Sequence, residues 1–186
     1  MNHHILLAKK AVENYVKERK IISPPNNLPE EFYRKKAGTF VTIEKNGQLR
    51  GCIGTYLPTR PNIAEEIIRN AIAAATEDYR FGPIRKEELP HLSYTVYILS
   101  EPELVKDLKE LNPKKFGIIV KTNPLVYPNE NVVFDDHFPF KSGLLLPDLP
   151  GVDSVEKQFL IACQKGGIDP AKEKVVIYRF SVEKYE

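Results

Sequence analysis

The chain has 186 residues, a length that fits one domain large enough to bury its own hydrophobic core. Its 42% hydrophobic and 28% charged residues are typical of a folded globular protein and exclude a disordered, apolar-poor chain. The 27 basic and 25 acidic residues are mixed along the sequence and leave a formal net charge of +2, so bulk charge gives no support for nucleic-acid binding.

The cysteines and the N-terminal segment indicate a reducing compartment. Cys52 and Cys163 are far apart, with no CxxC pair that would indicate a zinc knuckle or a disulfide framework. The first twenty residues are interrupted by lysines and match neither a signal peptide nor a membrane span. His3 and His4 fall where we expect an inert, frayed end. We therefore expect a cytoplasmic protein without membrane association, and no cofactor or metal is implied.

The first predicted elements are a helix and a hairpin. Residues 4–20 carry apolar side chains at helical spacing between Lys and Glu residues, which predicts an amphipathic helix. Residues 39–44 and 48–55 are two strand-like runs. They are joined around Asn46 and Gly47, the pair that best tolerates the positive φ angles of a type I′ turn.

A second helix and a charged turn follow the hairpin. Asn62 and Glu65 form a capping-box pattern ahead of apolar residues at helical spacing, which predicts a helix from Ile63 to about Thr76. The C-terminal half of this helix is nearly all alanine, so we expect it to pack closely against the sheet. Residues 77–83 then predict a charged, aromatic turn.

The rest of the chain is predicted to be rich in strands. Further strands are predicted at residues 92–99, 116–121, 131–134, 143–147 and 175–182. A helix should follow the capping box at residues 153–156 and run through residue 164. Since strands and helices do not alternate regularly, the sequence favours an α+β fold with a mainly antiparallel sheet packed with helices.

The segment of residues 49–55, LRGCIGT, is the first candidate for a functional site. Strand alternation predicts one face with Arg50, Cys52 and Gly54, and another with Leu49, Gly51, Ile53 and Thr55. A cationic neighbour stabilises a thiolate, so Arg50 would activate Cys52 as a nucleophilic or redox thiol, with the glycines clearing space for a ligand or another backbone. The alternative is structural, because cysteine often behaves as a small core residue and glycine often accompanies a bulge or a tight crossing.

For the other residues with reactive or charged side chains, a structural role is favoured over a functional one. Cys163 falls on the apolar face of its predicted helix and is assigned to the core. The acidic and histidine residues at 135–137 are metal-ligand types, but a solvated turn is favoured over a metal site. Asp78 and Arg80 predict a local ion pair in their turn, while the sharper hypothesis has Arg80 and Arg50 lining an anion-binding cleft.

Several blocks, taken in order, resemble the AMMECR-type domain family, whose prokaryotic members are called AmmeMemoRadiSam system protein A. The blocks are LRGCIGT at 49–55, NAIAAA at 70–75, DYRF at 78–81, LNPKKFG at 111–117, GLLLPDLPGVDSVEKQ at 143–158, KGGI at 165–168 and YRF at 178–180. The resemblance covers nearly the whole chain. Two departures are Tyr79, where the family usually has proline, and the stretch 122–142, which is longer than is usual in the family.

The resemblance implies a single α+β domain over residues 1–186 with a larger and a smaller lobe, and an LRGCIG strand near the cleft between them. The resemblance also implies that the protein functions together with Memo-like and radical S-adenosylmethionine proteins, but it does not imply a particular reaction. The candidate catalytic residues are Cys52 and Arg50. The candidate binding or signature residues are Leu49, Gly51, Ile53, Gly54, Thr55, Asn70, Asp78, Arg80 and Phe81.

Three hypotheses about function follow from these residues and this resemblance. The first is an accessory module that binds a small molecule or a partner protein at the LRGCIG strand. The second is an enzyme that uses the Cys52 thiol. The third, which the charge distribution supports least, is an RNA-binding accessory.

Overall fold

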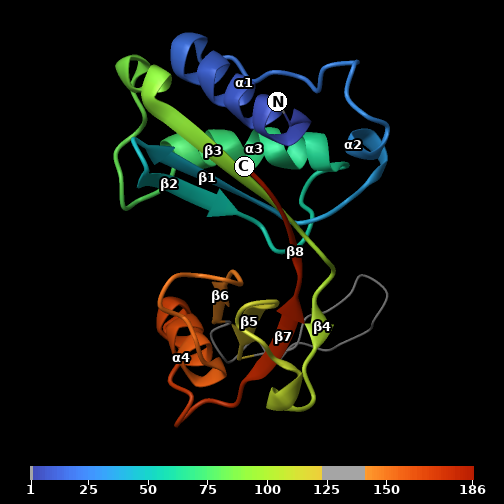
Figure 1. Cartoon of the computed structure of the whole chain (residues 1–186), viewed down its shortest axis with the longest axis vertical. Helices are drawn as coiled ribbons and strands as arrows, with labels where there is room; N and C mark the ends of the chain where they lie inside the picture. Colours follow the sequence, from blue (N-terminus) through green and yellow to red (C-terminus); the bar gives the residue numbers. More distant parts are fainter. Residues whose placement is uncertain (1, 123–140) are drawn as a thin grey trace. The chain divides into compact units, whose positions relative to one another are not determined.

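A computed structural model describes residues 2–122 and 141–186, which fall into two compact units (Figure 1). Unit 1 comprises residues 1–101 and 183–186, and unit 2 comprises residues 102–182. Each unit contains one four-stranded sheet, so two sheets replace the single sheet expected from the sequence. The mixture of helices and antiparallel sheets confirms the α+β class. That the whole chain forms one domain stays a prediction.

Unit 1 is a sheet with two long helices packed on it. Its elements are α1 (His3–Glu18), α2 (Glu31–Arg34), β1 (Thr39–Lys45), β2 (Gln48–Gly54), α3 (Ile63–Thr76), the 3₁₀ helix η1 (Lys86–His91), β3 (Leu92–Leu99) and β8 (Val182–Tyr185). The strand order is β2-β1-β3-β8, with β1 antiparallel to both β2 and β3. Helices α1 and α3 pack against each other and against this sheet.

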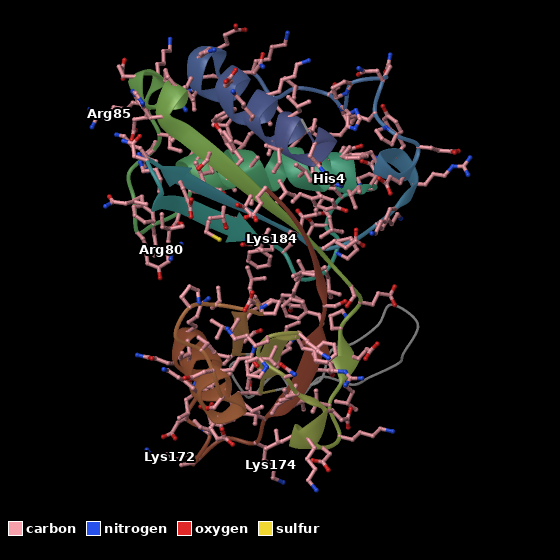
Figure 2. The ribbon with its side chains drawn as sticks, viewed as in Figure 1. His4, Arg80, Arg85, Lys172, Lys174 and Lys184 are labelled. Atoms are coloured by element: carbon pink, nitrogen blue, oxygen red, sulfur yellow. The ribbon has the colours of Figure 1, made fainter. Side chains whose placement is uncertain are left out.

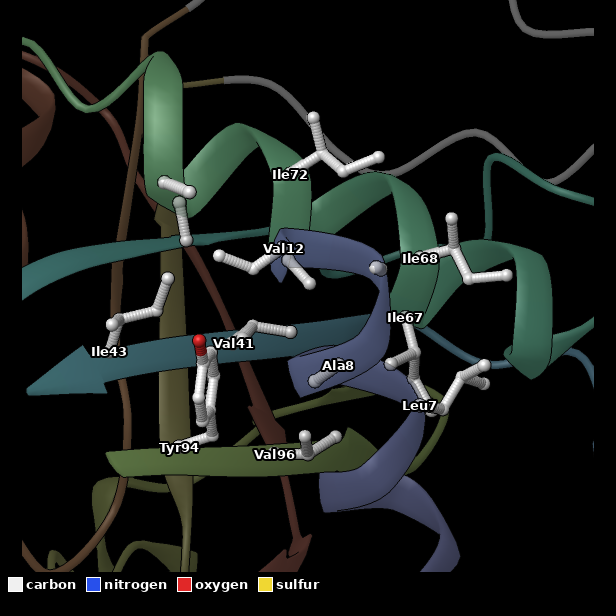
Figure 3. Packing of buried hydrophobic residues seen from close by; sticks show 14 of the residues in the cluster. Leu7, Ala8, Val12, Val41, Ile43, Ile67, Ile68, Ile72, Tyr94 and Val96 are labelled. Atoms are coloured by element: carbon white, nitrogen blue, oxygen red, sulfur yellow. The ribbon is translucent and has the colours of Figure 1, made fainter. Parts of the chain in front are cut away.

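The core of unit 1 lies between those helices and one face of the sheet, which we call the inner face. Val41 and Ile43 of β1 and Val96 of β3 are fully buried there beneath α1 and α3 (Figure 3). Alternate residues along the same strands therefore point to the opposite, outer face. The outer face, defined by Phe40, Thr42, Leu49, Cys52, Thr95 and Tyr97, is half-buried apart from the exposed Leu49.

Local sequence signals explain several boundaries in unit 1. Asn46 and Gly47 both have positive φ angles, as a type I′ turn requires, and they close the β1–β2 hairpin. The Asn62 side chain accepts a hydrogen bond from the Glu65 backbone, which confirms the predicted start of α3. The α1 and β3 predictions are also confirmed, to within two residues at each end.

Unit 2 is a second sheet with one helix. Its elements are β4 (Glu103–Leu104), the 3₁₀ helix η2 (Leu108–Glu110), β5 (Gly117–Lys121), β6 (Ser142–Leu145), α4 (Val155–Gly166) and β7 (Val176–Phe180). The strand order is β4-β7-β5-β6, and α4 packs on β5 and β6. Cys163 is buried among apolar side chains in this core, which confirms its assignment. The predicted strand at 131–134 and the residues at 135–137 lie outside the described residues.

The predicted last strand, residues 175–182, is wrong in one respect. The predicted strand corresponds to β7, but it is not the last one, because a further strand, β8, begins at Val182 and belongs to the other sheet. Strand β7 pairs with β4 and β5 in unit 2, whereas β8 lies beside β3 in unit 1. Alternating hydrophobicity indicates a strand but not the sheet that it joins, so the pattern alone could not reveal this division.

No helix within the described residues is long and apolar enough to cross a membrane.

Candidate functional site

The two glycines of LRGCIGT make room for neighbouring parts of the protein. A Cβ atom at Gly51 would collide with the carbonyl oxygen of Ala74 in α3, so this glycine lets the helix backbone sit directly on β2. A Cβ atom at Gly54 would collide with the Phe40 ring and the Thr39 carbonyl oxygen of β1. The expected close approach to another backbone is confirmed, and both glycines serve packing.

A β-bulge at Arg50 changes the predicted alternation of side chains. Ile43 pairs with Gly51, but the next residue, Glu44, pairs with Leu49, so Arg50 is the extra residue on β2. Cross-strand partners share a face, which places Leu49 on the outer face with Cys52. The prediction that Leu49 shares the face of Gly51 and Ile53 is therefore wrong, because a bulge interrupts the period of two.

Arg50 is bound to a carboxylate that the sequence analysis did not single out. Its Nε and Nη2 atoms donate to Oε1 and Oε2 of Glu88, each at 3.0 Å, and its Nη1 and Nη2 donate to the carbonyl oxygens of Gly82 and Pro83. Lys45 also contacts Glu88, and the Arg50 bond is the main reason that the pKa of Glu88 falls to about 2. This geometry makes Arg50 a bridge from β2 to η1, and its expected role as the partner of a thiolate stays a prediction.

Cys52 is half-buried on the outer face and held at two points. Its Sγ atom lies 3.2 Å from the Thr42 hydroxyl, which donates to it, and its backbone N–H donates to Asp78 Oδ2 at 2.9 Å. Thr42 is the cross-strand partner of both Cys52 and Thr95. A thiol and two threonine side chains therefore form one row across β2, β1 and β3, while the Asp78 bond satisfies an N–H at the edge of the sheet.

The turn after α3 is fixed by the predicted ion pair. Asp78 is buried and accepts hydrogen bonds from the Arg80 backbone, the Arg80 guanidinium and the Cys52 backbone. The Arg80 side-chain bond is the largest cause that lowers the pKa of Asp78 to about 2. The turn is therefore held without the proline usual in the family, and Tyr79 is 95% exposed at its tip.

Arg80 lies close enough to Cys52 for their charges to interact. A Cys52 thiolate contributes to the raised pKa of Arg80, although the bond to Asp78 is the main cause. Arg80 and Arg50 both lie near the Phe81 ring, at 5.5 and 6.0 Å from its centroid. The Arg80 side chain is 44% exposed, and Figure 2 shows it projecting from the turn that follows α3. Each arginine is paired with a carboxylate, and the anion-binding cleft between them stays a prediction.

A buried polar network lies under the end of β2, and only part of it was predicted. The Asn70 amide donates to the Thr39 backbone and hydroxyl and to the Thr55 hydroxyl. Thr55 in turn donates to Glu66, a fully buried carboxylate that also accepts from Thr59 and from the Arg60 backbone. Asn70 and Thr55 thus fix the loop between β2 and α3. Glu66 was missed because a glutamate in a first helical turn normally indicates only a favourable dipole contact.

The outer face has the chemistry of a contact surface. Aromatic, aliphatic and neutral polar side chains occupy it, while Glu44 and Lys184 lie close enough to influence the pKa of Tyr97. Burial is the main cause that raises this pKa, so Tyr97 stays a neutral phenol that donates or accepts hydrogen bonds. Among residues 2–122 and 141–186, no group of three His, Cys, Asp or Glu residues is arranged to hold a metal ion.

Comparisons with known proteins agree with this architecture. The AMMECR1 family model matches residues 5–185. A Thermotoga maritima protein is 48% identical over 184 residues, which cover 98% of this chain and 97% of that protein. A Clostridium acetobutylicum protein is 40% identical over 98% of this chain but only 36% of its own length. The names of these relatives state no activity.

A solved structure shares the fold. The crystal structure of the uncharacterized protein PH0010 from Pyrococcus horikoshii has a TM-score of 0.81 and 32% sequence identity, and the match covers 97% of this chain and 88% of that one. The family match and the relatives both extend over nearly all of the sequence. The chain therefore belongs to the AMMECR1 family.

Proposed function

We propose that the protein is a cytoplasmic binding module that docks a partner on its outer face around Cys52. The partners in this proposal are the Memo-like and radical S-adenosylmethionine proteins that the family resemblance implies. The supporting observation is which residues in and around the LRGCIGT segment make internal contacts and which remain at the surface. Gly51, Gly54, Arg50 and Asp78 are committed to internal contacts, whereas Leu49 and Cys52 remain at the surface.

The composition of the outer face supports docking of a protein or a small molecule. Aromatic and neutral side chains at the centre with charged residues at the rim are typical of protein interfaces, whose centres are depleted in charge. Phe40 and Tyr97 provide aromatic surface at one end of the face, and Leu49, which is 43% exposed, provides aliphatic surface at the other end, opposite Glu44. An interface here would bury Leu49 and the Cys52 row together.

The experiment is a binding titration with the Memo-like and radical S-adenosylmethionine proteins encoded in the same genome. Leu49→Glu, and separately Thr95→Lys, should weaken binding at least tenfold because each places a charge on the apolar and neutral part of the docking face. Leu160→Glu is the matched control, since Leu160 is 58% exposed on α4 in unit 2. Absence of binding by both wild-type partners, or equal losses in all three variants, would refute the proposal.

A second candidate function is an enzyme with Cys52 as its nucleophile. The observation that favours it is the Thr42 hydroxyl at 3.2 Å from Sγ, since a hydrogen bond to a thiolate stabilises its charged form. Arg80 is a nearby cation that would further stabilise the thiolate. The test is the alkylation rate of Cys52 across pH in a Cys163→Ala background. A thiol pKa that rises in Thr42→Val would support this function, and a rate equal to that of a cysteine peptide would exclude it.

A further inference from the structure

A groove in unit 1 lies on the other side of α3 from the sheet. It has a volume of about 610 Å³, within the range of small-molecule sites, and lies between the end of α1, the irregular segment 21–24 and α3. Figure 3 shows Ile68 and Ile72 pointing away from the strands, whereas Ile67 points towards them. These two isoleucines line the groove. The groove is therefore separate from the outer face and from the function proposed above.

The apolar part of the groove comes from three segments of the chain. Ile68 and Ile72 of α3 are buried, and Tyr15 of α1 lines the groove beside them. Ile21 contributes to the lining from the irregular segment and is 67% exposed. A ligand with an apolar body would remove the Ile21 side chain from water, and this burial would contribute hydrophobic free energy.

The polar part of the groove offers mainly hydrogen-bond donors. The Arg60 backbone is held by buried Glu66 at 2.7 Å, while its exposed guanidinium has no hydrogen-bond or ion-pair partner within the described residues. Arg69 is held by Glu77 through two bonds of 3.0 and 3.1 Å, and these bonds do not use its Nε–H.

The carboxylates of the groove already have partners. Both oxygens of Glu77 accept from Arg69, and Oε1 of Glu65 accepts from the cap residue Asn62. Most of the acceptors are therefore used, whereas the Arg60 donors are not. An acceptor-rich, negatively charged group is the complement of this arrangement, because a guanidinium binds a carboxylate through two parallel hydrogen bonds.

We propose that this groove binds an amphipathic carboxylic acid. Its carboxylate pairs with Arg60, and its apolar body lies along Ile68, Ile72 and Ile21. The rigid attachment of the Arg60 backbone to Glu66 fixes the origin of the guanidinium before binding, which reduces the entropy lost on binding.

The first experiment compares two probes of equal length and opposite charge, sodium decanoate and decylammonium chloride, each titrated calorimetrically into the full chain below its micelle-forming concentration. Decanoate should bind at one saturable site, at least tenfold more tightly than decylammonium. If decanoate does not bind at millimolar concentration, or if decylammonium binds equally well, the proposal is wrong.

Variants then locate the site. Arg60→Gln should weaken decanoate binding at least tenfold and leave the thermal midpoint unchanged, because the backbone bond to Glu66 remains. Arg85→Gln is the matched control, since Arg85 is also exposed (Figure 2) and does not line the groove. Ile21→Ser should weaken binding severalfold, and Leu6→Ser, at another exposed aliphatic residue outside the groove, should not. Equal losses in a variant and its control would overturn the proposal.

Discussion

Units 1 and 2 use the same packing device but place their cysteines differently. In unit 1, Gly51 of β2 accommodates the Ala74 carbonyl of α3, and in unit 2, Gly143 of β6 accommodates the Ala162 carbonyl of α4. Cys52 lies on the strand, next to its glycine and half-buried, whereas Cys163 lies on the helix and is buried. In both units the strand glycine makes room for a helix backbone, and the position of the thiol decides whether it can react.

The largest effect should come from adding a methyl group where either glycine contacts the helix backbone. Gly51→Ala and Gly143→Ala should each lower the free energy of unfolding by about 3 kcal/mol or more, because the new methyl group meets backbone atoms that cannot rotate away. Chemical denaturation is the measurement. Gly82→Ala is the control, since a Cβ atom there meets nothing within 4 Å. A loss below 1 kcal/mol at Gly51 would show that α3 can move away from β2 at little cost.

Acid should distinguish the two units. His4 is buried at the start of α1 (Figure 2). Its ring is stacked on Tyr185 at 3.8 Å and packed against Phe32. Burial is the main cause that lowers the pKa of His4 from 6.5 to about 4. The negative charge of Glu183 opposes this shift, whereas the positive charges of Lys35 and His3 add to it. The unfolded chain therefore binds the proton more tightly than the folded protein does.

The contribution of neutral His4 to the free energy of unfolding is fully present above pH 6.5 and is lost as pH falls towards 4. The loss is about 3 kcal/mol at most. Hydrogen exchange at pH 5 and pH 7 should show this loss in unit 1 and not in unit 2. His4→Phe should remove the loss in unit 1. An equal acid response in wild type and variant would mean that His4 is not its source.

The two thiols should differ in reactivity by about 100-fold. Burial raises the pKa of Cys163, and alkylation there requires the core of unit 2 to open. Cys52 is half-buried, so a small reagent should reach it in the folded protein. Mass spectrometry of iodoacetamide-treated protein measures both rates. Urea-unfolded protein is the control, because both thiols are exposed in it and should react at similar rates. Similar rates in the folded state would remove the contrast between the units.

The smallest effect should come from Asp78→Asn. The amide can still accept the Cys52 N–H bond but loses the charge that pairs with Arg80, so the free energy of unfolding should fall by about 1–2 kcal/mol, discounted because Arg80 is 44% exposed. The loss should vanish at low pH, since the Asp78 contribution is present above pH 3.8 and is lost as pH falls through about 2. Glu77→Gln is the control, and a loss as large at Glu77 would contradict a special role for Asp78.

Local signals in the sequence were sufficient for much of the fold. Turn residues, caps and periodicity located the β1–β2 hairpin, α3, β3 and α4, because neighbouring residues determine those features. The α2 helix, β4 and the 3₁₀ helices were not predicted, since a few residues carry too little periodicity. The separation of β7 and β8 into different sheets depends on strands that are distant in sequence.

The candidate site was predicted in part for the same reason. The segment around Cys52 was identified from its composition, and the Asp78–Arg80 pair from its spacing. The bond from Arg50 to Glu88 joins residues 38 positions apart, and the groove beside Arg60 depends on where the segment 21–24 crosses α3. No local pattern encodes such contacts. Likewise, the sequence near His4 and the sequence near Tyr185 do not predict that their rings stack, so a frayed, inert histidine was expected at the start of the chain.

The position of β8 sets an order for biosynthesis. Strand β8 is the neighbour of β3 in the sheet of unit 1, yet all of unit 2 is encoded between them. During translation, β1, β2 and β3 can pair early, but the exposed edge of β3 must wait until unit 2 has been synthesised before β8 arrives. Premature termination within unit 2 would leave that edge unprotected and available to strands of other chains. The nascent chain is thus expected to depend on chaperones longest at β3.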